Sequence, residues 1–122
     1  MTHAHYDHMD GIQDLLKRLD SIGYPAPKVF KRIDGNFSEK MRFKNNPILK
    51  TCLFNIKDSD TFHIDGITIS PVHTPGHLSD HLCYLIKEPC GTQSLFTGDH
   101  IIGANSTYFD DYPSYFESLV KT

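Results

Sequence analysis

The opening residues of the chain carry a dense group of side chains that can bind metal ions. His3, His5, Asp7 and His8 form the pattern His-x-His-x-Asp-His. Imidazole and carboxylate are ligands that Zn²⁺ accepts when cysteine thiolate is absent. Side chains two positions apart point the same way in an extended backbone, so His3 and His5 can face one cation. Asp7 and His8 lie beyond a bend and can face a second cation. The alternative is a solvated polar loop.

Two later motifs carry the same ligand types at the ends of predicted strands. A Thr-Pro-Gly-His sequence occupies positions 74–77, and its Pro-Gly turn can present His77 to a site. A Thr-Gly-Asp sequence occupies positions 97–99, where the Asp99 carboxylate could bridge two cations. Each motif alone is weak, because such a histidine is often a turn residue and such an aspartate is often a cap. In this order, together with the first cluster, they are a strong indication of a metal site.

The expected chemistry follows from a pair of cations. Two divalent ions roughly 3.5–4 Å apart lower the pKa of a shared water toward ~7, so hydroxide forms near neutral pH. That hydroxide would attack phosphorus or a carbonyl carbon, with Asp7 and Asp99 as ligands that orient it. Neighbouring groups must fix the imidazole tautomers. Asp80 is a candidate for this role, with a turn cap as the alternative. The remaining histidines are expected to be structural: His63, His73, His81 and His100.

The elements that position these residues can be predicted from apolar spacing and turn-forming residues. An apolar stripe predicts a helix over 10–22, which Asp10 can cap. Residues 31–46 are polar and aperiodic, which predicts an exposed loop. Residues 113–120 resemble a first helical turn, and Asp65-Gly66 a tight turn. Strands are predicted over 28–30, 51–56, 61–64, 67–72, 82–86 and 93–97.

The three motifs, taken in order, resemble the metallo-β-lactamase superfamily. The family pattern is Thr-His-x-His-x-Asp-His, then Thr-Pro-Gly-His, then Gly-Asp, and all three parts occur here. The resemblance implies a site for two zinc ions. It assigns one zinc ion to His3, His5 and His77, and the second to Asp7 and His8, with Asp99 bridging both.

Within the superfamily, the chain is most similar to the β-lactamase-like protein 2 endoribonucleases, which act on single-stranded RNA. The likeness includes the segments 8–12, 74–81 and 98–103. It implies a zinc-dependent endoribonuclease that cleaves RNA phosphodiesters, and makes a mitochondrial location plausible. A thioester hydrolase of the glyoxalase II kind is the alternative enzyme. A further alternative is an inactive fragment that retains some metal binding.

The family resemblance also implies the fold class, α+β, in a four-layer αβ/βα sandwich. That fold has strands ahead of the first histidine cluster and another histidine ligand in a later Pro-Gly-His segment. Neither occurs in these 122 residues. We therefore expect residues 1–122 to be a partial domain, truncated at both ends, whose second metal lacks one ligand and whose turnover is poor.

Composition narrows the remaining possibilities. The longest unbroken apolar run is the five residues 82–86, so no membrane span is expected. Three cysteines without CxxC spacing favour a reducing, intracellular setting, either cytoplasmic or the mitochondrial matrix. The net charge of −3 argues against general attraction to DNA. Residues 28–50 nevertheless carry a local charge of +5. This basic strip could hold an RNA backbone or could be a solvated loop.

Overall fold

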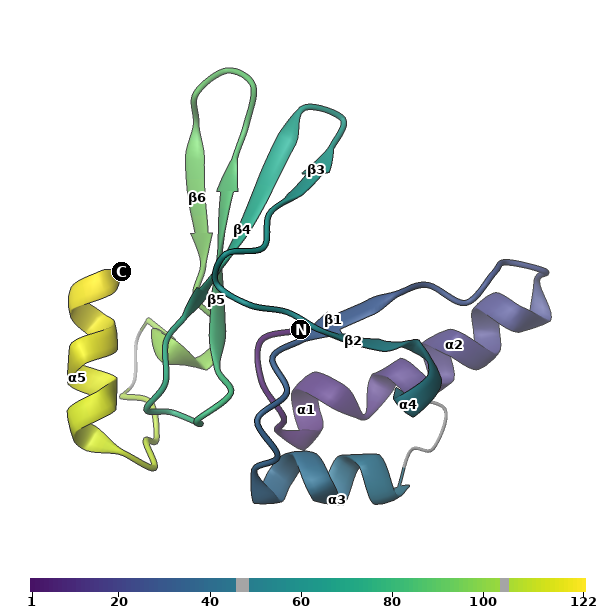
Figure 1. Ribbon diagram of the computed structural model, residues 1–122, viewed down its shortest axis with the longest axis horizontal. Helices are drawn as coiled ribbons and strands as arrows, with labels where there is room; N and C mark the ends of the chain where they lie inside the picture. The colour runs from purple at the N-terminus through teal and green to yellow at the C-terminus, as the bar shows by residue number, and fades with distance from the viewer. Residues whose placement is uncertain (46–48, 104–105) are drawn as a thin grey trace.

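The computed structural model describes residues 1–45, 49–103 and 106–122, without the side chains of Asn45 and Lys50. Helices and strands are mixed along the chain, as the sequence predicts (Figure 1). The helices are α1 (Tyr6–Met9), α2 (Gly11–Ser21), α3 (Phe37–Asn45), α4 (Leu49–Cys52), the 3-10 helix η1 (Gly98–His100) and α5 (Tyr112–Lys121). The strands are β1 (Val29–Lys31), β2 (Leu53–Asn55), β3 (Phe62–Ile64), β4 (Ile67–His73), β5 (Leu82–Lys87) and β6 (Gln93–Phe96).

The larger sheet is an antiparallel meander in the order β3-β4-β5-β6. Its first hairpin turns at Asp65 and Gly66, which have φ of 49° and 81°. A two-residue turn with both φ values positive matches the twist of the strands it joins, which confirms the predicted tight turn. The strands predicted over 61–64, 67–72, 82–86 and 93–97 are all present within a residue or so at each end.

A smaller parallel sheet pairs β1 with β2, and the connection between them contains α3 and α4. Parallel neighbours need such a crossover, since a tight turn cannot join them. The helical residues of the main apolar core come from α1, α2 and α4. One of its members, Leu78, comes from the loop between β4 and β5. Because this loop also carries His77, the His77 loop is anchored in this core. The buried core residues are Ala4, Met9, Leu16, Leu49, Cys52 and Leu78.

The predicted exposed loop over 31–46 is wrong, because most of it forms α3; residue 46 lies outside the described residues. The helix begins after Asn36, whose Oδ1 accepts the backbone N–H of Glu39 at 2.8 Å. Glu39 Oε2 in turn accepts the backbone N–H of Gly35 at 2.6 Å. An Asn-x-x-Glu sequence can satisfy helix-start donors in this way without apolar periodicity.

Three smaller corrections concern boundaries and caps. Thr51 and Cys52 belong to α4, so the strand predicted over 51–56 begins only at Leu53. Asp10 precedes α2 but makes no side-chain cap, because both of its carboxylate oxygens bind Arg42, at 2.9 and 2.7 Å. The short helix α1, which contains Asp7 and His8 of the first histidine cluster, was not anticipated.

The first residues of the chain lie between the two sheets (Figure 1). The backbone N–H of Leu82 donates to Thr2 O at 2.8 Å, and the Tyr84 hydroxyl donates to Met1 O at 2.6 Å. These bonds fix the first histidine cluster beside β5. No helix among the described residues is long and apolar enough to cross a membrane. Cys52 and Cys83 are buried, and Cys90 is exposed.

Candidate metal centre

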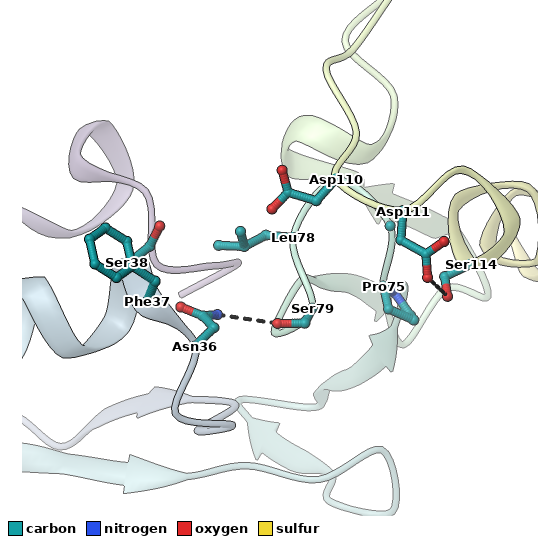
Figure 2. Close-up of a pocket in the computed structure, with 10 residues that line it drawn as sticks. Asn36, Phe37, Ser38, Pro75, Leu78, Ser79, Asp110, Asp111 and Ser114 are labelled. Carbon is teal, nitrogen blue, oxygen red and sulfur yellow. Dashed lines mark hydrogen bonds between the residues drawn. The ribbon is translucent and has the colours of Figure 1, made fainter.

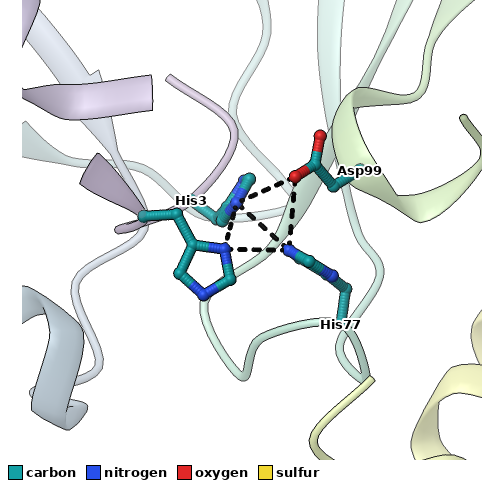
Figure 3. Close-up of side chains that lie close together, drawn as sticks. His3, His77 and Asp99 are labelled. Carbon is teal, nitrogen blue, oxygen red and sulfur yellow. Dashed lines mark hydrogen bonds and ion pairs between the residues drawn. The ribbon is translucent and has the colours of Figure 1, made fainter. Parts of the chain in front are cut away.

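Three imidazoles and one carboxylate converge on a single point (Figure 3). His3 Nε2 lies 2.9 Å from His5 Nδ1 and 3.2 Å from His77 Nε2, which is 3.0 Å from His5 Nδ1. Asp99 Oδ2 lies 3.6 Å from His3 Nε2 and 3.5 Å from His77 Nε2. Ligand atoms around tetrahedral Zn²⁺, with bonds of about 2.0–2.1 Å, are about 3.3 Å apart. The donor set and its spacing therefore fit a zinc ion.

A second group of possible ligands shares Asp99 with the first. Asp7, His8 and Asp99 form this group. His8 Nε2 is 3.3 Å from Asp99 Oδ1 and 3.6 Å from Asp7 Oδ2. The two oxygens of Asp99 thus face different groups, which is the arrangement expected of a carboxylate that bridges two cations. The structure brings together all six residues that the sequence predicts as ligands.

Each of these side chains is positioned at the end of an element. His5 has an extended backbone and Tyr6 starts α1, so Asp7 and His8 project from the first turn of a helix. His77 follows Gly76, which has a φ of 131°, and this turn brings the ring back toward the first cluster. Asp99 lies in η1, directly after β6 and the positive-φ Gly98. Strand and helix ends supply the rigid support that a metal site needs.

The nitrogens that point away from the convergence point also have partners. His77 Nδ1 is 2.6 Å from Tyr108 O and 3.1 Å from the Thr107 hydroxyl. Thr2 Oγ1 contacts Nδ1 of both His3 and His8. The sequence reasoning missed these threonines and proposed Asp80 for this role. The only signal for Thr2 is its place immediately before the first histidine.

Burial favours the neutral form of the His3 and His5 imidazoles by lowering their pKa, and the neutral form is the one that binds metals. Burial, reinforced by the neighbouring histidines, lowers the pKa of His3 far below its ordinary value of 6.5. Burial is also the main cause that lowers the pKa of His5. His81 lies fully buried behind His3, with ring centroids 5.0 Å apart, and burial lowers its pKa to about 3.

The histidines predicted to be structural make contacts outside the two ligand groups. His81 Nδ1 lies 2.9 Å from the Thr74 hydroxyl, and His73 Nε2 lies 2.8 Å from Ser79 O. His63 Nδ1 contacts Thr68 at 3.2 Å, and His100 is buried with its ring against Tyr115. These contacts agree with a supporting role.

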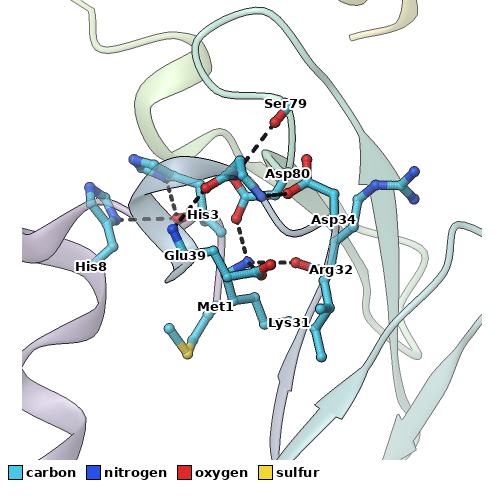
Figure 4. A network of polar contacts seen from close by, with 12 residues as sticks. Met1, His3, His8, Lys31, Arg32, Asp34, Glu39, Ser79 and Asp80 are labelled. Atoms are coloured by element: carbon cyan, nitrogen blue, oxygen red, sulfur yellow. Dashed lines mark hydrogen bonds and ion pairs between the residues drawn. The ribbon is translucent and has the colours of Figure 1, made fainter. Parts of the chain in front are cut away.

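Asp80 belongs to a separate buried cluster around Lys31 (Figure 4). The Lys31 ammonium donates to Glu39 Oε1 at 2.6 Å and pairs with Asp80 Oδ2. All three side chains are fully buried. Asn36 Nδ2 donates to Asp80 Oδ1 at 2.9 Å. Asp80 therefore fixes the His77 loop to β1 and α3, instead of orienting an imidazole as predicted.

The Lys31 cluster also bears on the prediction that the basic strip over 28–50 could hold an RNA backbone. Lys31 is inside the protein, and Arg42 is bound to Asp10. Neither is available to a phosphate backbone.

A pocket of about 280 Å³ lies beside the loop that carries His77 (Figure 2). It separates the start of α3 from the start of α5. Its lining mixes apolar groups with hydroxyl, amide and carboxylate groups. The lining residues are Asn36, Phe37, Ser38, Pro75, Gly76, Leu78, Ser79, Asp110, Asp111 and Ser114.

The family can now be stated. A family model described as the metallo-beta-lactamase superfamily matches residues 1–122, so the chain belongs to this superfamily. The superfamily predicted from the three motifs is thereby confirmed. Members are hydrolases that usually bind zinc, and the donor set described above suits that metal.

Curated relatives narrow the comparison. The chain is 31% identical over 119 residues to an "Atrochrysone carboxyl ACP thioesterase" of Passalora fulva, covering 98% of this chain and 30% of that protein. It is 36% identical over 121 residues to "Lactamase-like protein adaB" of Aspergillus niger, covering 99% of this chain and 32% of that protein. The chain thus spans about a third of the length of the curated relatives it matches. These names do not support the expected kinship with the β-lactamase-like protein 2 endoribonucleases.

A solved structure agrees on the fold. It is described as the first crystal structure of an archaeal metallo-beta-lactamase superfamily protein, from Sulfolobus tokodaii. It superposes with a TM-score of 0.57 at 20% identity, covering 88% of this chain and 50% of that one. The predicted α+β metallo-β-lactamase fold is therefore confirmed, with this chain matching part of the complete domain.

Proposed function

We propose that this chain forms the metal centre of a thioester hydrolase that acts on an acyl group carried by an acyl carrier protein. The main support for a hydrolase is that two groups of possible metal ligands converge on the shared carboxylate of Asp99. The thioester, rather than an RNA phosphodiester, is supported by the thioesterase names of relatives that match 98% of the chain. The glyoxalase II-like alternative drawn from the sequence is thereby favoured over the endoribonuclease.

The charge around the centre favours the same choice. Asp110 and Asp111 line the pocket beside the metal centre. Lys31, in contrast, is buried in an ion pair. A surface with these carboxylates would repel the phosphates of RNA and would tolerate an uncharged thioester.

The residues have separable roles in this reaction. His3, His5, His77 and Asp99 would hold one zinc ion, and Asp7, His8 and Asp99 would hold the second. Such ions, when bound, polarise a carbonyl group and make water more acidic. Asp99 would use one oxygen in each ligand group and so can only help to orient the attacking water, whereas Asp7 has a second oxygen that can accept a hydrogen bond from that water and take up its proton. In the overall reaction the C–S bond breaks, water oxygen joins the carbonyl carbon, and sulfur leaves as a thiol.

The pocket beside the His77 loop offers a place for the part of the carrier protein that holds the acyl group, here called the arm. Asn36, Ser38, Ser79 and Ser114 can exchange hydrogen bonds with amides, while Leu78 and Pro75 form an apolar wall. Because this wall belongs to the loop that carries His77, an arm lying here would end close to the metal ligands.

The test offers both substrates to the same zinc-loaded protein. An acyl thioester of a carrier protein is followed by the appearance of free thiol, and a labelled single-stranded RNA by gel electrophoresis. We expect zinc-dependent thiol release that a chelator abolishes, and intact RNA. Both assays are run at high protein concentration with multi-hour sampling, so that slow turnover is also detected.

Asp99→Ala and Asp14→Ala provide a matched pair of carboxylate variants. Asp99 lies at the centre of the site, whereas the Asp14 side chain is 87% exposed on α2. Only the first variant should lose thiol release. RNA cleavage that requires Asp99, without thiol release, would favour the endoribonuclease instead, and two bound zinc ions without either activity would also contradict the proposal.

A further inference from the structure

The hydroxyl of Thr2 lies between two imidazoles that belong to different ligand groups. Thr2 Oγ1 is 3.1 Å from His3 Nδ1 and 3.2 Å from His8 Nδ1. The opposite nitrogens of both rings face Asp99, with His3 Nε2 3.6 Å from Oδ2 and His8 Nε2 3.3 Å from Oδ1. One oxygen atom therefore contacts the far side of one ligand in each group.

This contact bears on where the imidazole protons reside. A neutral imidazole carries one proton, and the nitrogen that binds a cation must be the one without it. For His3 and His8 to offer Nε2, both protons have to be on Nδ1, where both N–H groups point at Thr2. A threonine hydroxyl has two lone pairs and can accept both bonds. If it donated to either ring, that ring would carry its proton on Nε2 and lose its ligand atom.

Thr2 is held so that its hydroxyl cannot easily move away. Its carbonyl oxygen accepts the backbone N–H of Leu82, at the start of β5, at 2.8 Å. On its other side the methyl carbon lies only 3.0 Å from where a Cβ on Gly98 would be. A β-branched side chain has few χ1 choices, and close packing against Gly98 restricts it further. Strand β5 and the turn before Asp99 thus fix the hydroxyl at its place.

We propose that Thr2 is a positioning residue that couples the two halves of the metal centre. Its hydroxyl accepts the Nδ1–H groups of His3 and His8 and so directs one Nε2 lone pair into each ligand group. The role presupposes the metal centre of the proposed function, but not its substrate. Removing the hydroxyl frees both rings to change tautomer and weakens both metal subsites together.

The first test measures the tautomers directly in the metal-free wild-type protein. Nitrogen-15 NMR of the imidazole rings at pH 7.5 distinguishes Nδ1–H from Nε2–H. We expect the Nδ1–H form for both His3 and His8. A predominant Nε2–H form in either ring overturns the proposal. This measurement needs neither a variant nor activity, so it decides the role of Thr2 even if thioester hydrolysis is not found.

The second test uses Co²⁺ as the probe and counts two binding steps by visible absorption and calorimetry. Thr2→Val keeps the shape without the hydroxyl, and we expect about a 10–100-fold loss of affinity at both steps. Thr2→Ser keeps the hydroxyl and should restore both steps. The control is Thr107→Val, since His77 is the one candidate ligand that the Thr107 hydroxyl contacts, and His77 keeps its 2.6 Å contact with Tyr108 O. Thr107→Val should lose less affinity for Co²⁺ than Thr2→Val, and at only one of the two binding steps.

Several results would contradict the coupling. They are unchanged binding in Thr2→Val, a loss confined to one step, or a Thr2→Ser variant as weak as Thr2→Val, which would assign the effect to packing. If Thr2→Val does not fold, as judged by circular dichroism, the tautomers of the wild-type protein remain the deciding measurement.

Discussion

Two buried polar clusters lie on either side of the same loop, and they satisfy their charges differently. Around Lys31, the ammonium of the protein itself is paired with the carboxylates of Glu39 and Asp80. Around Asp99, three imidazoles place ring nitrogens within 3.2 Å of one another and close to a carboxylate. The first cluster is complete within the chain, whereas the second has the donor set of a cation site. The fold should therefore depend on the first in every condition, and on the second only when metal is bound.

The loop 74–81 joins these two regions, since it supplies His77 to one and Asp80 to the other. Gly76 is its most constrained point, because a Cβ there would lie 2.3 Å from Cα of Tyr115 and φ is 131°. Gly76→Ala should destabilise the protein by more than about 5 kcal/mol, enough to abolish cooperative unfolding in a small domain. Thermal melts followed by circular dichroism, with and without zinc, measure this.

Gly11→Ala is the matched control, because nothing lies within 4 Å of a Cβ at that helical position. It should leave the protein as stable or up to about 1 kcal/mol more stable. Equal melting of the two variants would mean that the loop does not join the clusters as described.

Lys31→Met separates the clusters by removing the cation from only one of them. Two buried carboxylates would lose their partner, which costs about 3–5 kcal/mol of the free energy of unfolding. The loss should be the same in zinc and in chelator. Urea denaturation at both conditions measures it.

Lys17→Met serves as the control for Lys31→Met. Lys17 pairs with Asp14 at 3.8 Å, and both side chains are mostly exposed. Its removal should change the free energy of unfolding by less than about 0.5–1 kcal/mol. A Lys31 effect that appears only with zinc would remove the distinction between the two regions.

Added zinc should stabilise the protein only through the cluster around Asp99. At a concentration 100 times its Kd, zinc stabilises a folded protein by about 2.7 kcal/mol. Asp99→Ala should reduce this gain by more than about 1.4 kcal/mol, a tenfold loss of affinity. Differential scanning calorimetry at matched zinc concentrations measures the gain.

Lys31→Met should retain the full zinc increment if enough of it remains folded. If Asp99→Ala kept the wild-type increment, the ligand groups described here would not be the zinc site.

The two regions also differ in how far the sequence could predict them. Residue type and local order predicted the six candidate ligand positions and the superfamily, because each motif is short and holds its residues close together in the chain. The Lys31 cluster was not predicted, since a lysine in a polar stretch is ordinarily solvated. Its burial depends on Asp80, which is far along the chain. The prediction of α3 as a loop failed for a different, local reason, because the helix has no apolar periodicity and its start depends on side-chain bonds of Asn36 and Glu39.

The role of Asp80 was wrong for a related reason. Asp80 was a candidate for fixing an imidazole tautomer, with a turn cap as the alternative, but its carboxylate binds Lys31 of β1 and Asn36. The substrate was predicted as RNA partly from the basic strip, and two of its cations proved to be paired inside the protein or on its surface. Candidate metal ligands can be predicted from short sequence patterns, whereas substrate preference depends on surfaces assembled from distant segments.

The smallest expected effect is the response of the two clusters to acid, and it has opposite signs in them. Burial lowers the pKa of His81 to about 3, from an ordinary value of 6.5. Between these values the unfolded chain binds a proton that the folded protein does not, so stability falls as pH falls. Burial raises the pKa of Asp80 above 3.8, so that group favours the folded state as pH falls toward 3.8.

A His81→Gln variant isolates the first of these contributions. The free energy of unfolding of the metal-free protein, measured in urea at pH 6 and pH 5, should fall by about 1 kcal/mol less in the variant than in the wild type. His63→Gln, at an exposed position of β3, should leave the wild-type difference unchanged. If His63→Gln flattened the pH dependence as much as His81→Gln, protonation of exposed histidines, rather than the buried rings behind the metal centre, would account for the acid sensitivity.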